Sequence, residues 1–194
     1  MSPILSMLSV PVLAAILAAP LTSHRTGAST FREEDRGLSV FADGYPGSLG
    51  ADDAYVPVPV AIALMTTGAS VGFTLESFTL SDAQGNRVPA ASFTELRNTY
   101  PKLDLDRELI RTRPIALGMT ITDRPRITSS FYPPTGDGTR ISRVELAPFS
   151  WFSDVVYFPR PRAGLGGVMT LSVVAAGREP VELKFLMDSG LLAK

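Results

Sequence analysis

The chain has 194 residues, with 18 basic and 19 acidic side chains and a formal net charge of −1. This length suits one globular domain with a two-layer core, and neither sign of charge is gathered into a run that would indicate nucleic-acid binding. The chain contains no cysteine and one histidine, His24. A disulfide framework, a cysteine nucleophile, a histidine-based catalytic triad and a multi-histidine zinc site are therefore excluded within one chain.

The N-terminal residues form an apolar stretch. Residues 4–21 are interrupted only by serines and prolines, and polar residues follow. This order is typical of an export signal, but no lysine or arginine precedes it, so an uncleaved anchor and a misread start codon are the alternatives. We expect a signal peptide or N-terminal anchor over residues 1–21, a linker over residues 22–36, and a periplasmic, cell-envelope or secreted domain over residues 37–194, which contacts a membrane only through residues 4–21 if they are retained.

The stretch from Tyr55 to Arg87 contains the clearest strand pattern. Large branched residues occupy every second position of its first half, with prolines, alanines and a methionine between them, so a strand places all of them on one face. Pro57 and Pro59 cannot donate to a ladder, so pairing on their side begins near Val60 or the strand lies at a sheet edge. The large residues are Val56, Val58, Val60, Ile62 and Leu64.

The second half of this stretch changes phase. Val71, Phe73 and Leu75 alternate, whereas Phe78 and Leu80 alternate in the opposite phase. A bulge or a crossing between sheets near residues 76–77 explains this change. The following sequence, from Asp82 to Asn86, is typical of a turn, with Gly85 available for a positive φ.

The remaining chain contains more short strands and few helices. Two short helical segments, residues 91–97 and 106–111, form an insertion between strands. The most regular hairpin comes last, and in it residues 169–175 face residues 181–187 across the turn from Gly177 to Pro180. Further strands are expected at residues 38–41, 115–121, 127–131, 144–146 and 155–158.

About 7–9 short strands with many turns favour an all-β fold, an antiparallel immunoglobulin-like β-sandwich with a short helical insertion near residues 91–111. The run Phe78-Thr79-Leu80-Ser81-Asp82-Ala83-Gln84-Gly85 resembles a phrase of bacterial exported immunoglobulin-like domains of unknown function. The specific part of this resemblance covers Met65 to Asn86. It implies an exported sandwich domain and supplies no active site.

Acidic and hydroxyl side chains offer few candidates for chemistry. Asp104, Asp106 and Glu108 have a spacing that an oxygen-rich calcium loop can use, but one of the two aspartates as a helix N-cap explains the same residues. Asp82 suits the turn that contains it. Serines such as Ser129 have no base at a supporting spacing. We expect no metal, no cofactor and no enzymatic activity.

The densest aromatic cluster comprises Phe149, Trp151 and Phe152, and includes the only tryptophan of the chain. Sandwich domains often bury one tryptophan in the core, but exposed aromatic side chains can also bind a partner or a glycan. We therefore expect a non-catalytic protein-interaction domain whose partner is another envelope protein, contacted through this cluster or through a strand edge at residues 56–60. The alternative is a carbohydrate or small-ligand binding module that uses exposed aromatics near Trp151.

Overall fold

The computed structural model describes residues 23–26, 29–49, 53–112, 115–134, 139–162 and 167–187. The expected signal peptide or anchor over residues 1–21 lies outside the described residues. Within the described ranges, no helix has the length and apolar character needed to cross a membrane.

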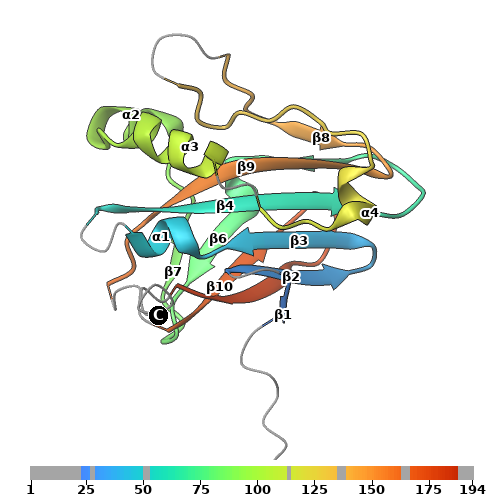
Figure 1. The fold of residues 1–194 in the computed structure, drawn as a ribbon, viewed down its shortest axis with the longest axis horizontal. Coiled ribbons are helices and arrows are strands. Elements are labelled where there is room, and N and C mark those ends of the chain that lie inside the picture. The colour runs from blue at the N-terminus through green and yellow to red at the C-terminus, as the bar shows by residue number, and fades with distance from the viewer. Residues whose placement is uncertain are drawn as a thin grey trace, which may run out of the picture.

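The described chain is mostly antiparallel β-structure arranged in three sheets (Figure 1). The five-stranded sheet has the order β1 (His24–Arg25), β2 (Thr30–Asp35), β3 (Leu38–Asp43), β4 (Tyr55–Leu64) and β9 (Ser150–Pro159). The four-stranded sheet has the order β11 (Val181–Leu186), β10 (Val168–Val173), β6 (Phe78–Ser81) and β7 (Arg87–Pro89). A two-stranded sheet joins β5 (Val71–Phe73) to β8 (Val144–Leu146). This composition confirms the predicted all-β class.

Helices are short and lie outside the sheets. They are α1 (Tyr45–Leu49), the 3₁₀ turn η1 (Leu75–Ser77), α2 (Phe93–Thr99), α3 (Leu103–Thr112) and α4 (Met119–Thr122). Figure 1 shows α2 and α3 together above the five-stranded sheet, in the connection between β7 and β8. The predicted helical insertion near residues 91–111 is confirmed, and Ser92 begins it by accepting a hydrogen bond from the backbone N–H of Glu95 at 3.2 Å.

One apolar core lies between the two larger sheets. Val58 and Ile62 of β4 and Phe78 and Leu171 of the four-stranded sheet are each 0 % exposed and belong to the same cluster. The β10–β11 register pairs Leu171 with Leu183, as the alternating pattern of this hairpin predicts. The large branched side chains of β4 therefore face the core, as expected from their spacing.

Strand β4 is central, so the expectation that it could lie at an edge is wrong. Its whole length, Tyr55 to Leu64, pairs with β9. On the other side, pairing with β3 covers only Val60 to Leu64. Pro57 and Pro59 lie beyond this shorter ladder, where no N–H group is needed. Pairing on their side begins at Val60, as predicted.

The change of phase after Phe73 is a crossing between sheets, as predicted. Phe73 ends β5, η1 follows, and Phe78 begins β6 in the four-stranded sheet. The turn after β6 is also confirmed, because Asp82 accepts hydrogen bonds from the backbone N–H groups of Gln84 and Asn86 at 3.0 and 2.8 Å. Gly85 there has a φ of 84°.

The predicted linker over residues 22–36 is wrong in its second half, because Thr30–Asp35 is strand β2. Its residues pair with β3 in six consecutive positions. Phe31 is 1 % exposed and provides the only large apolar contact of this strand with the core. The polar pattern of Arg32 to Asp35 suggested a tether because this half of the strand is half-buried to exposed and carries no alternating apolar residues.

Two of the predicted strands are absent from the described chain. Residues 115–121 form an irregular segment followed by α4, and Gly118 has a φ of 77°, which interrupts extended backbone. Residues 127–131 run alongside β9 without forming a named strand, and one isolated parallel bridge joins Arg126, just before them, to Trp151. Both segments contact β-strands through side chains and single hydrogen bonds. The alternation of apolar residues alone does not distinguish such contacts from strand pairing.

Candidate functional site

The outer face of the five-stranded sheet contains a second, smaller apolar cluster. Along β4, the residues between the large branched ones are small, and Ala61 and Ala63 are each 1 % exposed on this face. Phe41 of β3 and Ile121 of α4 complete the buried part of the cluster. The small side chains of β4 leave room above the sheet, and the chain from residue 115 to residue 122 covers part of it.

Trp151 lies at the edge of this cluster. It pairs with Ala63 across the β4–β9 ladder and is partly buried. Its indole Nε1–H donates to the backbone oxygen of Arg124 at 3.0 Å, and the guanidinium carbon of Arg126 lies 5.2 Å from the ring centroid. The ring is thereby held by a hydrogen bond and a cation–π contact.

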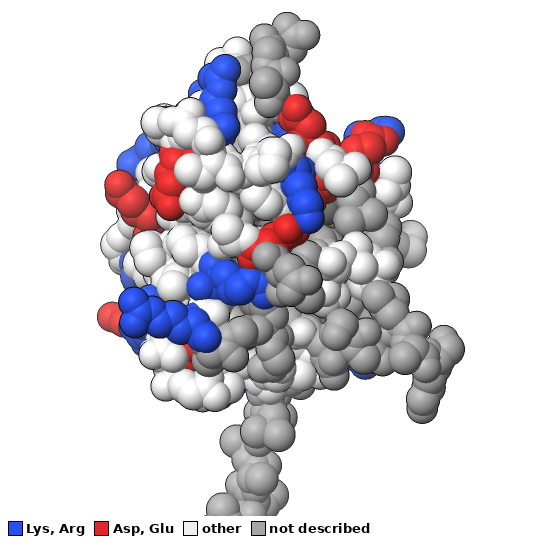
Figure 2. Space-filling view, turned by 90° about the vertical axis from the view of Figure 1, so that its left-hand side faces the viewer, with Lys and Arg blue, Asp and Glu red and all other residues white. Residues whose placement is uncertain are grey.

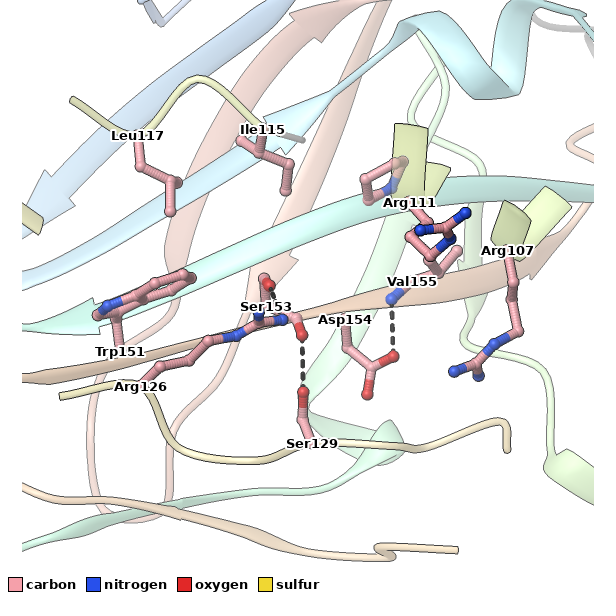
Figure 3. A pocket seen from close by; sticks show the side chains of 11 residues that line it. Arg107, Arg111, Ile115, Leu117, Arg126, Ser129, Trp151, Ser153, Asp154 and Val155 are labelled. Carbon is pink, nitrogen blue, oxygen red and sulfur yellow. Dashed lines mark hydrogen bonds between the residues drawn. The ribbon is translucent and has the colours of Figure 1, made fainter. Parts of the chain in front are cut away.

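A pocket of about 320 Å³ opens beside Trp151 on this outer face (Figure 3). We call it the Trp151 pocket. Its walls combine apolar side chains, three arginines, two serines and one aspartate. They come from β4, β9, α3 and the two segments that flank α4. The lining residues are Pro59, Arg107, Arg111, Ile115, Leu117, Arg126, Ser129, Trp151, Ser153, Asp154 and Val155.

The three arginines approach the Trp151 pocket from two elements. Arg107 and Arg111 are four residues apart on α3, so they lie on the same side of that helix. Arg107 donates to the backbone oxygen of Tyr132, and Arg111 forms an ion pair with Glu108 at 2.7 Å. Arg126 begins the segment beside β9, residues 126–131, and donates to Ser153 Oγ at 2.9 Å.

Asp154 fixes the segment beside β9. Its Oδ2 accepts the backbone N–H of Phe131 at 2.9 Å, and its Oδ1 accepts the backbone N–H of Val155 at 2.8 Å. Ser129 Oγ adds a donation to the backbone oxygen of Ser153 at 2.7 Å. Burial raises the pKa of the Asp154 carboxyl, while the two backbone hydrogen bonds act in the opposite direction.

The two serines of the pocket make structural hydrogen bonds. Ser129 Oγ donates to a carbonyl, and Ser153 Oγ accepts from a guanidinium. Neither contact removes a proton from a serine, which an activated nucleophile requires. Guanidinium groups instead offer several donors in a planar fork that suits carboxylate and phosphate oxygens.

Comparison of the chain with protein-family models, with curated proteins and with solved structures gives no match.

The three aromatic residues singled out in the sequence occupy different environments. Phe149 is 37 % exposed, has a φ of 55°, and has the guanidinium of Arg124 at 5.6 Å from its ring centroid. Trp151 lines the pocket. Phe152 is 0 % exposed and its ring lies 5.5 Å from that of Phe73 in the main core. The prediction that Phe152 contacts a partner is therefore wrong, because successive residues of a strand point to opposite faces.

The predicted strand-edge surface is wrong as well. Val56, Val58 and Val60 are each 0 % exposed. They point into the core between the sheets, while the backbone of the same strand pairs with β9 along its whole length. On the side that β3 does not reach, α1 packs against the strand, and every residue of β4 is buried.

The acidic candidates have structural contacts. Asp104 and Asp106 both lie in the first turn of α3, which begins at Leu103, so neither is its N-cap and the capping interpretation is wrong. Asp106 instead accepts a hydrogen bond from the Tyr100 hydroxyl at 2.6 Å. Within the described residues, no group of three or more acidic, histidine or cysteine side chains is placed to hold a metal ion.

Three pocket residues were not expected from the sequence: Arg107, Arg111 and Arg126. The four-residue spacing of Arg107 and Arg111 was visible within a predicted helix. The small residues between the valines of β4 were also visible, and they leave space on one face. The sequence contained no signal that α3 and the segment from residue 115 come together over that face.

Proposed function

We propose that the chain is a non-catalytic binding domain that holds a small ligand in the Trp151 pocket. The observation that carries this proposal is the position of Trp151, whose partly buried ring forms a wall of a cavity of about 320 Å³. Cavities of roughly 300–1,000 Å³ with apolar walls and a few placed polar groups are typical of small-molecule sites. The volume of this pocket is at the small end of that range, so it suits a small ligand.

Docking of another envelope protein is the second candidate, and we prefer ligand binding. An aromatic docking platform needs several adjoining exposed rings. Of the three candidates, Phe149 is exposed, Trp151 is partly buried in the pocket wall, and Phe152 lies in the core. The serine contacts described above support a non-catalytic role.

An immunoglobulin-like arrangement is part of the proposal. In immunoglobulin domains, strands A, B and E share one sheet, and strands G, F, C and C′ share the other in that order. The order β3-β4-β9 and the order β11-β10-β6-β7 match this scheme with β4 as strand B and β10 as strand F. Export is proposed from the apolar run of residues 4–21 alone.

A screen of neutral and charged fragments by saturation-transfer NMR tests the binding function. Ser153→Leu fills the Trp151 pocket from β9, and Ser172→Leu is the matched control because Ser172 is also a partly exposed serine within a strand, in the other sheet. We expect fragments that bind the wild type and Ser172→Leu but not Ser153→Leu. A screen in which the same fragments bind all three proteins would contradict ligand binding in this pocket.

A further inference from the structure

We infer that the ligand of the Trp151 pocket is a small organic anion, with its carboxylate or phosphate group on the arginines and its apolar body against Ile115, Leu117 and Trp151. This inference rests on the proposed binding function and adds the chemical class of the ligand.

Three arginines converge on one cavity. In Figure 3, the side chains of Arg107 and Arg111 descend from α3 on one side, and Arg126 extends beside Ser153 on the other. Ser153 Oγ occupies one donor of Arg126, and the Tyr132 carbonyl occupies one donor of Arg107. A guanidinium carries five N–H donors, so both side chains can donate further hydrogen bonds to a bound group.

The described lining of the pocket carries an excess of positive charge. Among the described residues, neither Arg107 nor Arg126 forms an ion pair with a carboxylate, whereas Arg111 pairs with Glu108. Both oxygens of Asp154, the one acidic side chain among the described lining residues, accept backbone N–H groups. The lining therefore carries more positive than negative charge, and an anionic ligand compensates the excess.

This excess is local. On the face drawn in Figure 2, basic and acidic side chains are interspersed over the described surface, and the whole chain has a formal net charge of −1. An anion is therefore attracted by the arginines of the cavity and not by the overall charge of the molecule.

The pocket has an apolar wall and a polar wall. Ile115 and Leu117 come from the segment before α4 and pack with Trp151 against the small cluster on the outer face. Arg107 and Arg111 lie on α3, away from Trp151 in Figure 3. A molecule with an apolar or aromatic body and one anionic group satisfies both walls, because planar carboxylates and phosphates match the guanidinium fork.

The single tryptophan makes the inference directly measurable, because its fluorescence reports on this pocket alone. The full chain is titrated with phenyl phosphate, with benzoate and with benzyl alcohol, which has the same ring and no charge. We expect both anions, or one of them, to bind about tenfold or more tightly than benzyl alcohol, and to weaken as salt is added. The phosphate and carboxylate arms identify which anion is preferred.

Two variants locate the charge contact. Arg111→Gln changes a side chain whose described partner is Glu108 on the same helix, and Arg107→Gln removes the half-buried guanidinium. Each is expected to weaken anion binding by about tenfold and to leave benzyl alcohol binding unchanged. Arg87→Gln, on β7 and outside the pocket lining, is the control. Thermal melts verify folding, and Arg111→Gln keeps the test valid if Arg107→Gln unfolds.

The outcomes separate the two levels of the proposal. Equal binding of the anions and benzyl alcohol, unaffected by either arginine variant, would overturn the anion class while leaving a small-ligand pocket in place. Anion binding that persists in Ser153→Leu would also overturn it, because the anions would then bind elsewhere. No fluorescence response to any of the three probes at millimolar concentration overturns the inference, whereas the fragment screen alone decides the binding function.

Discussion

The guanidinium of Arg126 lies 5.2 Å from the centre of the Trp151 ring and donates to Ser153 Oγ at 2.9 Å. These two contacts connect the segment beside β9 to the strand itself. They add to the isolated bridge between Arg126 and Trp151 and to the bond from the Ile127 N–H to the Trp151 oxygen at 2.7 Å. One wall of the pocket is therefore held by contacts that involve the side chains of the site.

Replacing Arg126 with glutamine should alter the environment of Trp151. The change removes the cation from the ring, so we expect a changed emission spectrum and a loss of roughly 0.5–1 kcal/mol in the free energy of unfolding, the usual strength of an exposed cation–π contact. Fluorescence spectra and urea unfolding measure both effects. Arg87→Gln, which removes only an exposed ion pair with Glu182 at 4.0 Å, should leave the emission spectrum unchanged. An unchanged Arg126→Gln spectrum would show that the guanidinium does not occupy this position in solution.

The hairpin of β10 and β11 was predictable because local rules agree there. Both strands alternate, the turn between them contains glycine, and the outward positions such as Glu182 and Lys184 are polar. The structure of the segment from Ile115 to Ile121 was not predictable, because the same alternation also suits a segment that lies over a sheet. Gly118 was the local signal against a continuous strand.

The candidate site was predictable only in part. The sequence showed an aromatic residue, Trp151, and a face of β4 with small side chains. Their contact depends on the register of β4 with β9, which pairs Ala63 with Trp151. The position of Arg107 depends on how α3 packs, far along the chain from β4. Contacts of this kind are set by tertiary packing and not by local propensity.

The variant Phe152→Ala tests whether this side chain belongs to the core and not to the pocket surface. Phe152 lies between Phe73 and Phe131, with ring centroids at 5.5 and 6.3 Å, and is 0 % exposed. Its truncation leaves a cavity and should lower the free energy of unfolding by roughly 3–5 kcal/mol. Phe149→Gly should change it by about 1 kcal/mol or less, because glycine relieves the positive φ of an exposed residue. Urea unfolding compares them, and similar losses would contradict the assignment of Phe152 to the core.

Asp154→Asn should loosen the segment beside β9. One amide nitrogen replaces a carboxylate oxygen, so a donor then faces the backbone N–H of Phe131 or of Val155. We expect a loss of about 1–3 kcal/mol and faster amide hydrogen exchange at Phe131. Asp123→Asn, at an exposed position, should have little effect.

The pH dependence of that loss has a defined sign. Burial raises the pKa of Asp154 in the folded chain, so the folded state binds a proton more tightly than the unfolded state. The contribution of this carboxyl to the stability of the wild type is therefore complete below about pH 4 and falls as the pH rises through the raised pKa. The gap between wild type and Asp154→Asn should therefore narrow toward neutral pH. A gap that widens instead would contradict the burial of the carboxyl.

Asp82 should have the opposite linkage. The side-chain amide of Asn86 donates to its Oδ2 at 2.8 Å, and this bond, together with the backbone N–H groups of the turn, lowers the pKa of Asp82 below its ordinary value. Because the folded state then binds the proton less tightly than the unfolded state, the stabilisation is complete above about pH 4 and is lost as the pH falls through the lowered value.

Asn86→Ala tests this directly, since it removes the side-chain donor and keeps the backbone N–H that Asp82 also accepts. The melting temperature of Asn86→Ala should lie below that of the wild type at pH 7, and the difference should shrink at pH 3. Gln84→Ala is the matched control, because Gln84 contributes its backbone N–H and has an exposed side chain. A difference for Asn86→Ala that is the same at both pH values would show that the amide acts through the geometry of the turn and not through the charge of Asp82.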